Sequence, residues 1–126
     1  MIKFLINRLV SFTPAFNGLE YIITTQKNSW FHLAATAAAV FLSIWLKLSN
    51  TDFAIILLAI GLVWVAECIN TGIEATIDLV SPERNHLAKV AKDVSAAGVL
   101  CAAIISAIIG IFIFANPLLL KLKIIS

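Results

Sequence analysis

Long apolar runs separated by short polar breaks give the chain its pattern and predict its elements. Residues 30–49, 53–79 and 94–115 are predominantly apolar over lengths that can cross a bilayer as helices. A short polar turn separates the first two runs, and a polar connector, residues 81–93, separates the last two. We therefore expect three transmembrane helices. Ser81-Pro82, at the beginning of the connector, resembles a helix start, and Pro117 is expected to end the third span.

The first 29 residues follow a different pattern. Phe12, Phe16, Leu19 and Ile23 repeat at i, i+4, i+7 and i+11, so they line one face of a helix, while polar residues occupy the rest. A helix of this kind lies in the plane of the membrane surface. Residues 1–29 are thus predicted to form an interfacial amphipathic helix, broken or started at Pro14. The segment lacks the apolar core of a secretory signal, so we expect it to remain in the mature protein.

Composition places the chain among membrane proteins. Its 126 residues are 61% hydrophobic and only 13% charged, with a mean hydropathy of +1.02, which is too apolar for a soluble domain of this length. The prediction is one all-α integral membrane domain over residues 1–126. A net charge of +2 without a basic run argues against nucleic acid as a partner. Cys68 and Cys101 are too few for a disulfide framework and are expected to be small buried packing residues.

The distribution of Lys and Arg predicts the orientation in the membrane. Residues 1–29 and the 81–93 connector hold most of the positive charges (Lys3, Arg8, Lys27, Arg84, Lys89 and Lys92), whereas the opposite side holds Lys47, Lys121 and Lys123. The positive-inside rule places the N-terminus and the connector in the cytoplasm, where ATP is available.

A polar stripe crosses the second predicted helix. Glu67, Asn70, Glu74 and Asp78 fall at i, i+3, i+7 and i+11 and therefore share one narrow helical face. A charged side chain near the bilayer centre costs about 2.5–3.5 kcal/mol even on the lenient insertion scale. The alternative is that this helix end lies among the lipid headgroups, where carboxylates cost little. We favour a functional stripe, because all four polar groups lie on the same face.

These residue types point to acid–base or metal chemistry at a membrane interface. One carboxylate can hold a divalent metal that bridges nucleotide phosphates, and the other can accept a proton from a hydroxyl. Lys92 could neutralise a transferring phosphoryl group. The sequence has no Walker A loop, no protein-kinase glycine-rich loop and no His-Arg-Asp motif. A proton or ion relay through Glu67 and Glu74 remains an alternative at this point.

Two segments together resemble a known family. Glu-Cys-Ile-Asn-Thr-Gly-Ile-Glu-Ala-Thr-Ile-Asp at 67–78 and Ala-Lys-Val-Ala-Lys-Asp at 88–93 are similar to the signature of the prokaryotic diacylglycerol kinases, a family that includes the undecaprenol kinases of Gram-positive bacteria. The resemblance covers residues from about 12 to 113. It implies a multi-pass lipid kinase of the bacterial inner membrane, a homotrimer with active sites shared between subunits. Such an enzyme would use Mg²⁺ and ATP to phosphorylate the hydroxyl of diacylglycerol or undecaprenol at the cytoplasmic face.

The resemblance also implies roles for individual residues. Glu67 matches the general base, and Glu74 matches a metal ligand and nucleotide contact. Asn70, which lies between them in the sequence, matches a polar residue that positions the substrate. The remaining matches contact ATP: Lys92, Asp93, Glu83, Arg84 and Asn85. Asp78 is either a further site residue or a solvated carboxylate at the helix end.

Three positions depart from the family pattern. Gln26 stands where the family usually has a glutamate that shares the metal, Asn85 where it often has a histidine, and Ala96 where it often has a polar residue. An amide oxygen can coordinate a hard cation but adds no charge, so Gln26 is expected to be a weak ligand of the metal and of ATP. His32 is expected to be an interfacial bystander. A non-catalytic member of the family and a small ion- or proton-coupled membrane component are the alternative functions.

Overall fold

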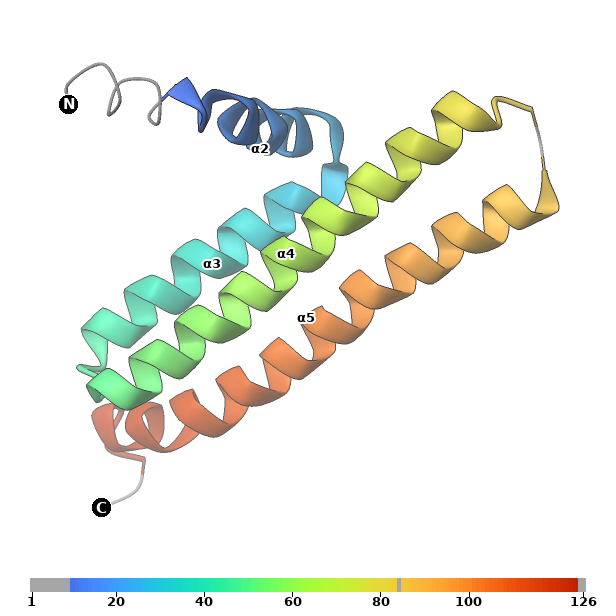
Figure 1. The fold of residues 1–126 in the computed structure, drawn as a ribbon. Coiled ribbons are helices and arrows are strands. Elements are labelled where there is room, and N and C mark those ends of the chain that lie inside the picture. The colour runs from blue at the N-terminus through green and yellow to red at the C-terminus, as the bar shows by residue number, and fades with distance from the viewer. Residues whose placement is uncertain (1–9, 84, 125–126) are drawn as a thin grey trace.

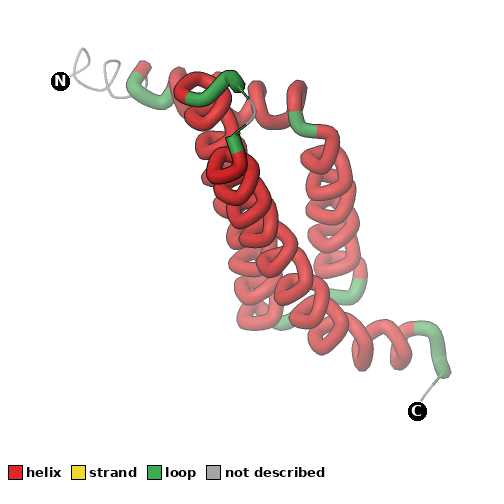
Figure 2. Tube along the Cα trace, turned by 90° about the vertical axis from the view of Figure 1, so that its right-hand side faces the viewer, coloured by secondary structure: helices red, strands yellow, loops and turns green. Residues whose placement is uncertain are grey.

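The computed structural model describes residues 10–83 and 85–124, and within them every regular element is a helix. The helices are α2 (Thr13–Thr25), α3 (Lys27–Trp45), α4 (Asn50–Val80) and α5 (His86–Lys121). The last three run up and down beside one another, and α2 is turned away from them across the end where α3 begins (Figures 1 and 2). The N-terminal side and the α4–α5 connector therefore lie at one end of the bundle, and the α3–α4 turn lies at the other.

The helix ends follow local sequence signals. Pro14 occupies the first turn of α2, as expected for a residue that starts a helix. The α3–α4 turn closes with Lys47 at φ 54°, while the Leu48 amide donates to the Ser43 carbonyl at 3.0 Å. Ser49 then caps α4, because its hydroxyl accepts from the Asp52 amide at 3.1 Å.

The third predicted helix is much longer than expected, and three expectations about it are wrong. The 81–93 connector shrinks to residues 81–85, because Asn85 caps α5 by accepting from the Leu87 amide at 2.8 Å. Ser81 ends α4 instead of starting a helix. Pro117 lies inside α5, where it removes only one backbone donor close to the helix end, so the helix continues for another turn.

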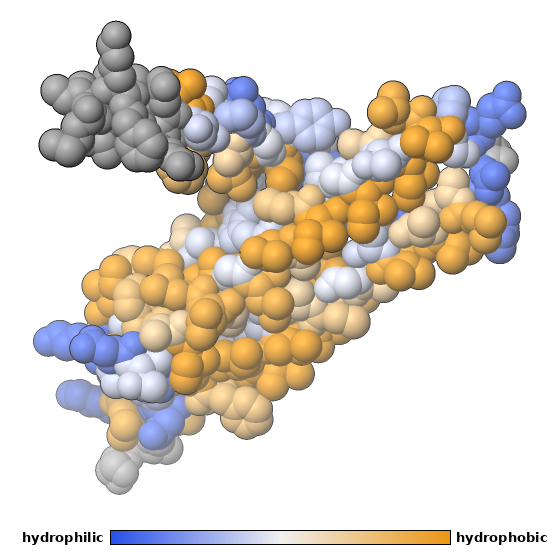
Figure 3. Space-filling view, viewed as in Figure 1, coloured by the Kyte–Doolittle hydropathy of each residue, from blue (hydrophilic) through white to orange (hydrophobic). Residues whose placement is uncertain are grey.

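Two of the described helices, α4 and α5, are long and apolar enough to cross a membrane by length and composition. Only 22% and 11% of their most apolar windows are buried inside the molecule, so these are not the core helices of a soluble protein. Their outward faces carry large exposed side chains such as Leu58, Ile69 and Phe112. Figure 3 shows a continuous apolar surface along both helices, with hydrophilic residues gathered at the bundle ends. α3, with 19 residues, is shorter and does not meet this combined criterion of length and apolar composition.

Hydrogen bonds between helices fix the bundle below the polar stripe. Ser106 Oγ on α5 donates to the Ala59 carbonyl on α4 at 2.9 Å, and Trp64 Nε1 on α4 donates to Thr36 Oγ1 on α3 at 3.0 Å. In an apolar phase such bonds and small-residue packing replace the hydrophobic effect as the force between helices. Together they hold α3 and α5 against α4, the helix that carries the polar stripe.

Replacing Ser106 with alanine should destabilise the folded protein in detergent by about 0.6 kcal/mol, the typical worth of an interhelical hydrogen bond in a membrane protein. The measurement is the free energy of unfolding in mixed micelles, compared with that of Cys101→Ala on the same helix. Cys101 was expected to be buried, but it is exposed. Equal losses in the two variants would contradict a specific contribution from the Ser106 bond.

Candidate active site

The polar stripe of α4 faces inward. Glu67 and Asn70 are buried, at 3% and 7% exposure, whereas Asp78 is exposed near the helix end. Glu74 lies between them and is half-buried. The stripe therefore runs from the apolar interior of the bundle out to the connector, and its deepest carboxylate is enclosed by protein.

A chain of side-chain hydrogen bonds links three parts of the fold through this stripe. Gln26, in the break between α2 and α3, donates through Nε2 to Glu74 Oε2 at 3.3 Å. Asn70 donates through Nδ2 to the other oxygen, Glu74 Oε1, at 3.2 Å. Ser95 Oγ on α5 lies 2.7 Å from Asn70 Oδ1 and 2.9 Å from the Lys92 carbonyl. We call this series, Gln26–Glu74–Asn70–Ser95, the amide–carboxylate chain.

The amide–carboxylate chain borders a cavity of about 360 Å³, which we call the inner cleft. Its polar wall is formed by Gln26, Glu67, Asn70 and Glu74, and Ala96 and Ala103 belong to its apolar wall on α5. His32 of α3 completes it, with Nε2 4.0 Å from Glu67 Oε2. The inner cleft thus places a buried carboxylate, a second carboxylate with two amide partners, and an imidazole around one space.

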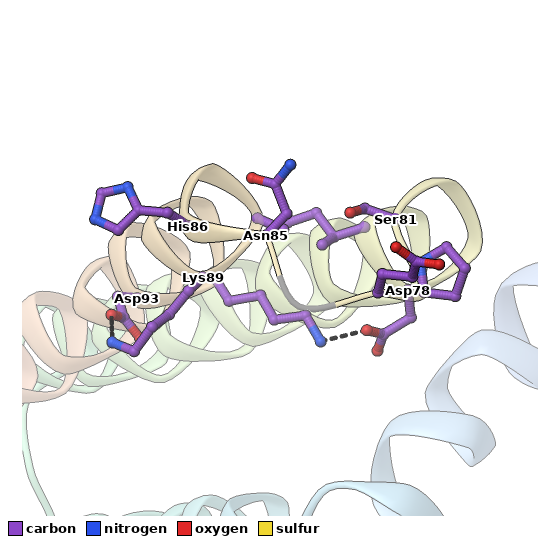
Figure 4. A pocket seen from close by; sticks show the side chains of 11 residues that line it. Asp78, Ser81, Asn85, His86, Lys89 and Asp93 are labelled. Atoms are coloured by element: carbon purple, nitrogen blue, oxygen red, sulfur yellow. Dashed lines mark hydrogen bonds and ion pairs between the residues drawn. The ribbon is translucent and has the colours of Figure 1, made fainter.

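A second cavity of about 610 Å³, the outer cleft, opens where α4 and α5 meet the connector (Figure 4). Lys92 forms an ion pair with Asp78, and Lys89 forms one with Asp93 at 2.5 Å. Exposed ion pairs of this kind are worth at most about 1 kcal/mol, so an incoming phosphate can replace the carboxylate partner of either lysine.

The predicted ATP-contacting residues are divided between the two cavities: Gln26 and Glu74 border the inner cleft, and the others that the structure describes line the outer cleft. Lys92, Asp93, Glu83 and Asn85 all line the outer cleft, as does Asp78. The Asn85 side chain already serves as the cap of α5, a structural role that its sequence position did not reveal. Arg84 lies outside the described residues.

The donor set fits a magnesium ion that arrives with nucleotide phosphates. Among the described residues no group of three or more His, Cys, Asp and Glu side chains could hold a metal by itself. Glu74, however, has the amides of Gln26 and Asn70 on its two oxygens, and a half-turn of either amide replaces its NH₂ group with a carbonyl oxygen. Mg²⁺ prefers oxygen ligands and is commonly held by one or two carboxylates together with substrate phosphates.

Sequence reasoning missed two members of this site. Ser95 lies one helical turn after Lys92 and therefore shares its helical face, so the spacing could have marked Ser95 as a further site residue. In the structure it bonds to Asn70. His32 was expected to be an interfacial bystander, yet its Nε2 lies 4.0 Å from Glu67 Oε2. Ala96, the position where the family often has a polar residue, lies in the apolar wall of the inner cleft.

Comparison with known proteins decides the family. Residues 13–114 match the family model described as prokaryotic diacylglycerol kinase. The chain belongs to this family. It is 40% identical over 104 residues to the undecaprenol kinase of Bacillus subtilis, covering 82% of this chain and 85% of the relative. It is 38% identical over 114 residues to the diacylglycerol kinase of Synechocystis sp., covering 90% of this chain and 65% of the relative.

More distant kinases match as well. The diacylglycerol kinase of Escherichia coli is 28% identical over 109 residues, covering 81% of this chain and 89% of the relative. No solved structure matches the chain. The family and the names of these relatives confirm the prediction of a lipid kinase.

Ser95→Ala should lower kcat/KM for ATP about fivefold to tenfold, the effect of losing one part-buried hydrogen bond worth about 1 to 1.4 kcal/mol. Without the hydroxyl, Asn70 loses its contact with α5 and holds Glu74 less firmly. Steady-state kinetics with varied ATP measures the change. Ser95→Thr keeps the hydroxyl and should retain most of the activity, so a similar loss in both variants would contradict this role for the hydrogen bond.

Proposed function

We propose that this protein transfers the γ-phosphate of ATP to the hydroxyl of a membrane lipid, diacylglycerol or undecaprenol, at the cytoplasmic face. The observation that carries the proposal is the order of groups along α4. Glu67 lies deepest, Glu74 lies two turns further out, and Asp78 lies at the outer cleft with Lys92. A lipid hydroxyl approaching from the apolar side meets Glu67 first, and a nucleotide approaching from the connector meets Lys92 and Glu74 first.

The spacing supports an in-line transfer. Seven residues of α-helix separate Glu67 from Glu74, about 10 Å along the axis, which leaves room for a γ-phosphate between them. Glu67 accepts the proton of the lipid hydroxyl as its oxygen attacks phosphorus. Glu74 and Asn70 orient the phosphates from one side of the inner cleft, and Lys92 and Asp93 contact the nucleotide in the outer cleft. Glu74, with weak help from Gln26, would hold a magnesium ion, which would supply positive charge to the phosphate oxygens.

The proposed enzyme is a homotrimer with three spans in a bacterial inner membrane. The family resemblance supports the trimer, and the length of α3, about 28 Å, supports a third span of a bilayer core about 30 Å thick. Phe16, Leu19 and Tyr21 of α2 are exposed, as an interfacial helix requires for contact with lipid. The Lys and Arg distribution supports a cytoplasmic N-terminus and connector.

Glu67→Gln should reduce phosphate transfer at least about a hundredfold, because a positioned general base contributes 10²- to 10⁴-fold. The assay follows label from γ-labelled ATP into diacylglycerol and into undecaprenol, each with and without Mg²⁺. Size-exclusion chromatography checks that the oligomer is intact.

The matched control is Glu20→Gln, which removes a carboxylate on the exposed surface of α2. Full activity in Glu67→Gln would remove Glu67 as the base. Absence of transfer to either lipid by the unaltered protein would contradict the proposed activity.

Gln26→Glu should lower the Mg²⁺ concentration for half-maximal activity several-fold, because a second carboxylate beside Glu74 adds ligand charge. The measurement is a Mg²⁺ titration of kinase activity, with Gln26→Met as the control that removes the amide oxygen. An unchanged Mg²⁺ requirement in both variants would contradict a role for residue 26 at the metal. Activity that appears only in the glutamate variant would favour the non-catalytic alternative for the natural sequence.

A further inference from the structure

The hydroxyl of Ser29 makes a contact across the break between α2 and α3. Ser29 lies in the first turn of α3 and is fully buried, at 0% exposure. Its Oγ donates to the Ile22 carbonyl of α2 at 3.1 Å. A buried hydroxyl in a helix commonly bonds to a carbonyl of its own helix, as Ser43 Oγ does with the Ala39 carbonyl at 2.7 Å. Ser29 instead uses its hydroxyl to join two helices.

One carbonyl oxygen holds both sides of the break. The Ile22 carbonyl accepts the Ser29 hydroxyl and also the backbone N–H of Gln26, the latter at 2.9 Å. The Ser29 N–H in turn donates to the Gln26 carbonyl at 3.1 Å. Between these bonds Gln26 has an extended backbone, at φ −95° and ψ 113°. The backbone of Gln26 is therefore fixed from the α2 side and from the α3 side.

The backbone of Gln26 decides where its side chain points. As the residue before α3, Gln26 occupies the N-cap position, but its side chain makes no capping bond there. Its Nε2 donates instead to Glu74 Oε2 at 3.3 Å. That distance is already at the long end for an N–H···O bond, so a small rotation at the break would separate the two groups.

Packing alone holds α2 weakly. Within α2, all of which the structure describes, Ile22 is the one buried residue. The helix projects from the bundle beyond the point where α3 begins (Figure 1). A helix with so little buried surface has few contacts that resist a change of its direction. The hydrogen bonds at the break therefore have a large share in fixing where α2 lies.

We propose that Ser29 is a positioning residue for the reaction. By binding the Ile22 carbonyl, its hydroxyl fixes the direction of α2 and the backbone of Gln26, so that the Gln26 amide reaches Glu74. Ser29 does not line the inner cleft itself and acts through Gln26. The inference rests on the proposed function and deepens it, because it names a residue outside the cleft that controls a group within it.

The direction of α2 can be measured without catalysis. In a Cys68→Ala/Cys101→Ala background, spin labels on Glu20→Cys and Leu79→Cys report the distance between exposed positions of α2 and α4. Labelled protein is mixed with an excess of the cysteine-free background before reconstitution, so that pairs within one chain dominate the signal. Double electron–electron resonance then gives the distribution of this distance.

Ser29→Ala should broaden the distance distribution, because α2 loses its bond to α3. Ser43→Ala is the matched control, since it removes a buried hydroxyl of the same helix that bonds within that helix. It should leave the distribution unchanged. An unchanged distribution in Ser29→Ala, or equal broadening in the two variants, would overturn the proposal.

The effect on the reaction is tested by a Mg²⁺ titration. Ser29→Ala should raise the Mg²⁺ concentration for half-maximal activity about threefold to tenfold, as expected for one lost hydrogen bond, with little change of kcat at saturating Mg²⁺. Ser29→Cys keeps the side-chain size and a weak donor and should give a smaller effect. In a Gln26→Met background, Ser29→Ala should have no further effect, because the amide that it positions is absent. A fall of kcat alone, or an equal loss with and without the Gln26 amide, would overturn the positioning role.

The two measurements separate this inference from the proposed kinase activity. A broader distribution in Ser29→Ala alone, with no phosphate transfer by the unaltered protein, would contradict the kinase and keep Ser29 as the residue that fixes α2. Phosphate transfer with equal distance distributions in Ser29→Ala and Ser43→Ala would overturn the role of Ser29 and keep the kinase.

Discussion

The structure depends on keeping a carboxylate partnered inside an apolar bundle. Both oxygens of Glu74 accept amide N–H groups, from Gln26 and Asn70, and Ser95 ties Asn70 to α5. Even a half-buried carboxylate loses part of its solvation, and these contacts offset that loss, which is the condition for placing the group there. Because the partners come from three segments of the chain, the same contacts that hold Glu74 also fix the position of the α2–α3 break and of α5.

The second condition is an unbroken α4. A helix satisfies its own backbone in an apolar phase, so one continuous element can carry polar side chains from the interior to the surface. Glu67, Glu74 and Asp78 share a face but differ in burial, from 3% exposure at Glu67 to 66% at the Asp78 side chain. One helix thus provides three environments for the same type of group: an enclosed one, a half-buried one with amide partners, and a solvated one with Lys92 nearby.

Much of this arrangement was predictable because periodicity and apolar length report helix faces directly. The bounds of α4 were predicted to within a few residues, and the residues of its polar stripe were predicted from their spacing. The family signature identified the lipid kinase. The start of α5 was predicted eight residues too late, since a polar connector and a capped helix start have similar compositions. His32 and Ser95 were missed because their importance comes from contacts with α4, which spacing within their own helices does not encode.

If the outer cleft receives the nucleotide, as the proposed function requires, its charges have a consequence for how that nucleotide approaches. The described charged side chains that line it are two lysines, Lys89 and Lys92, and three acids, Asp78, Glu83 and Asp93. With Arg84, which follows Glu83 in the sequence, the formal charges of this region balance, so it offers a bare polyphosphate no long-range attraction. A nucleotide whose charge is already offset by a divalent cation meets little resistance there. Added electrolyte should then change the rate of that encounter little, whereas it would slow the encounter with a basic phosphate trap.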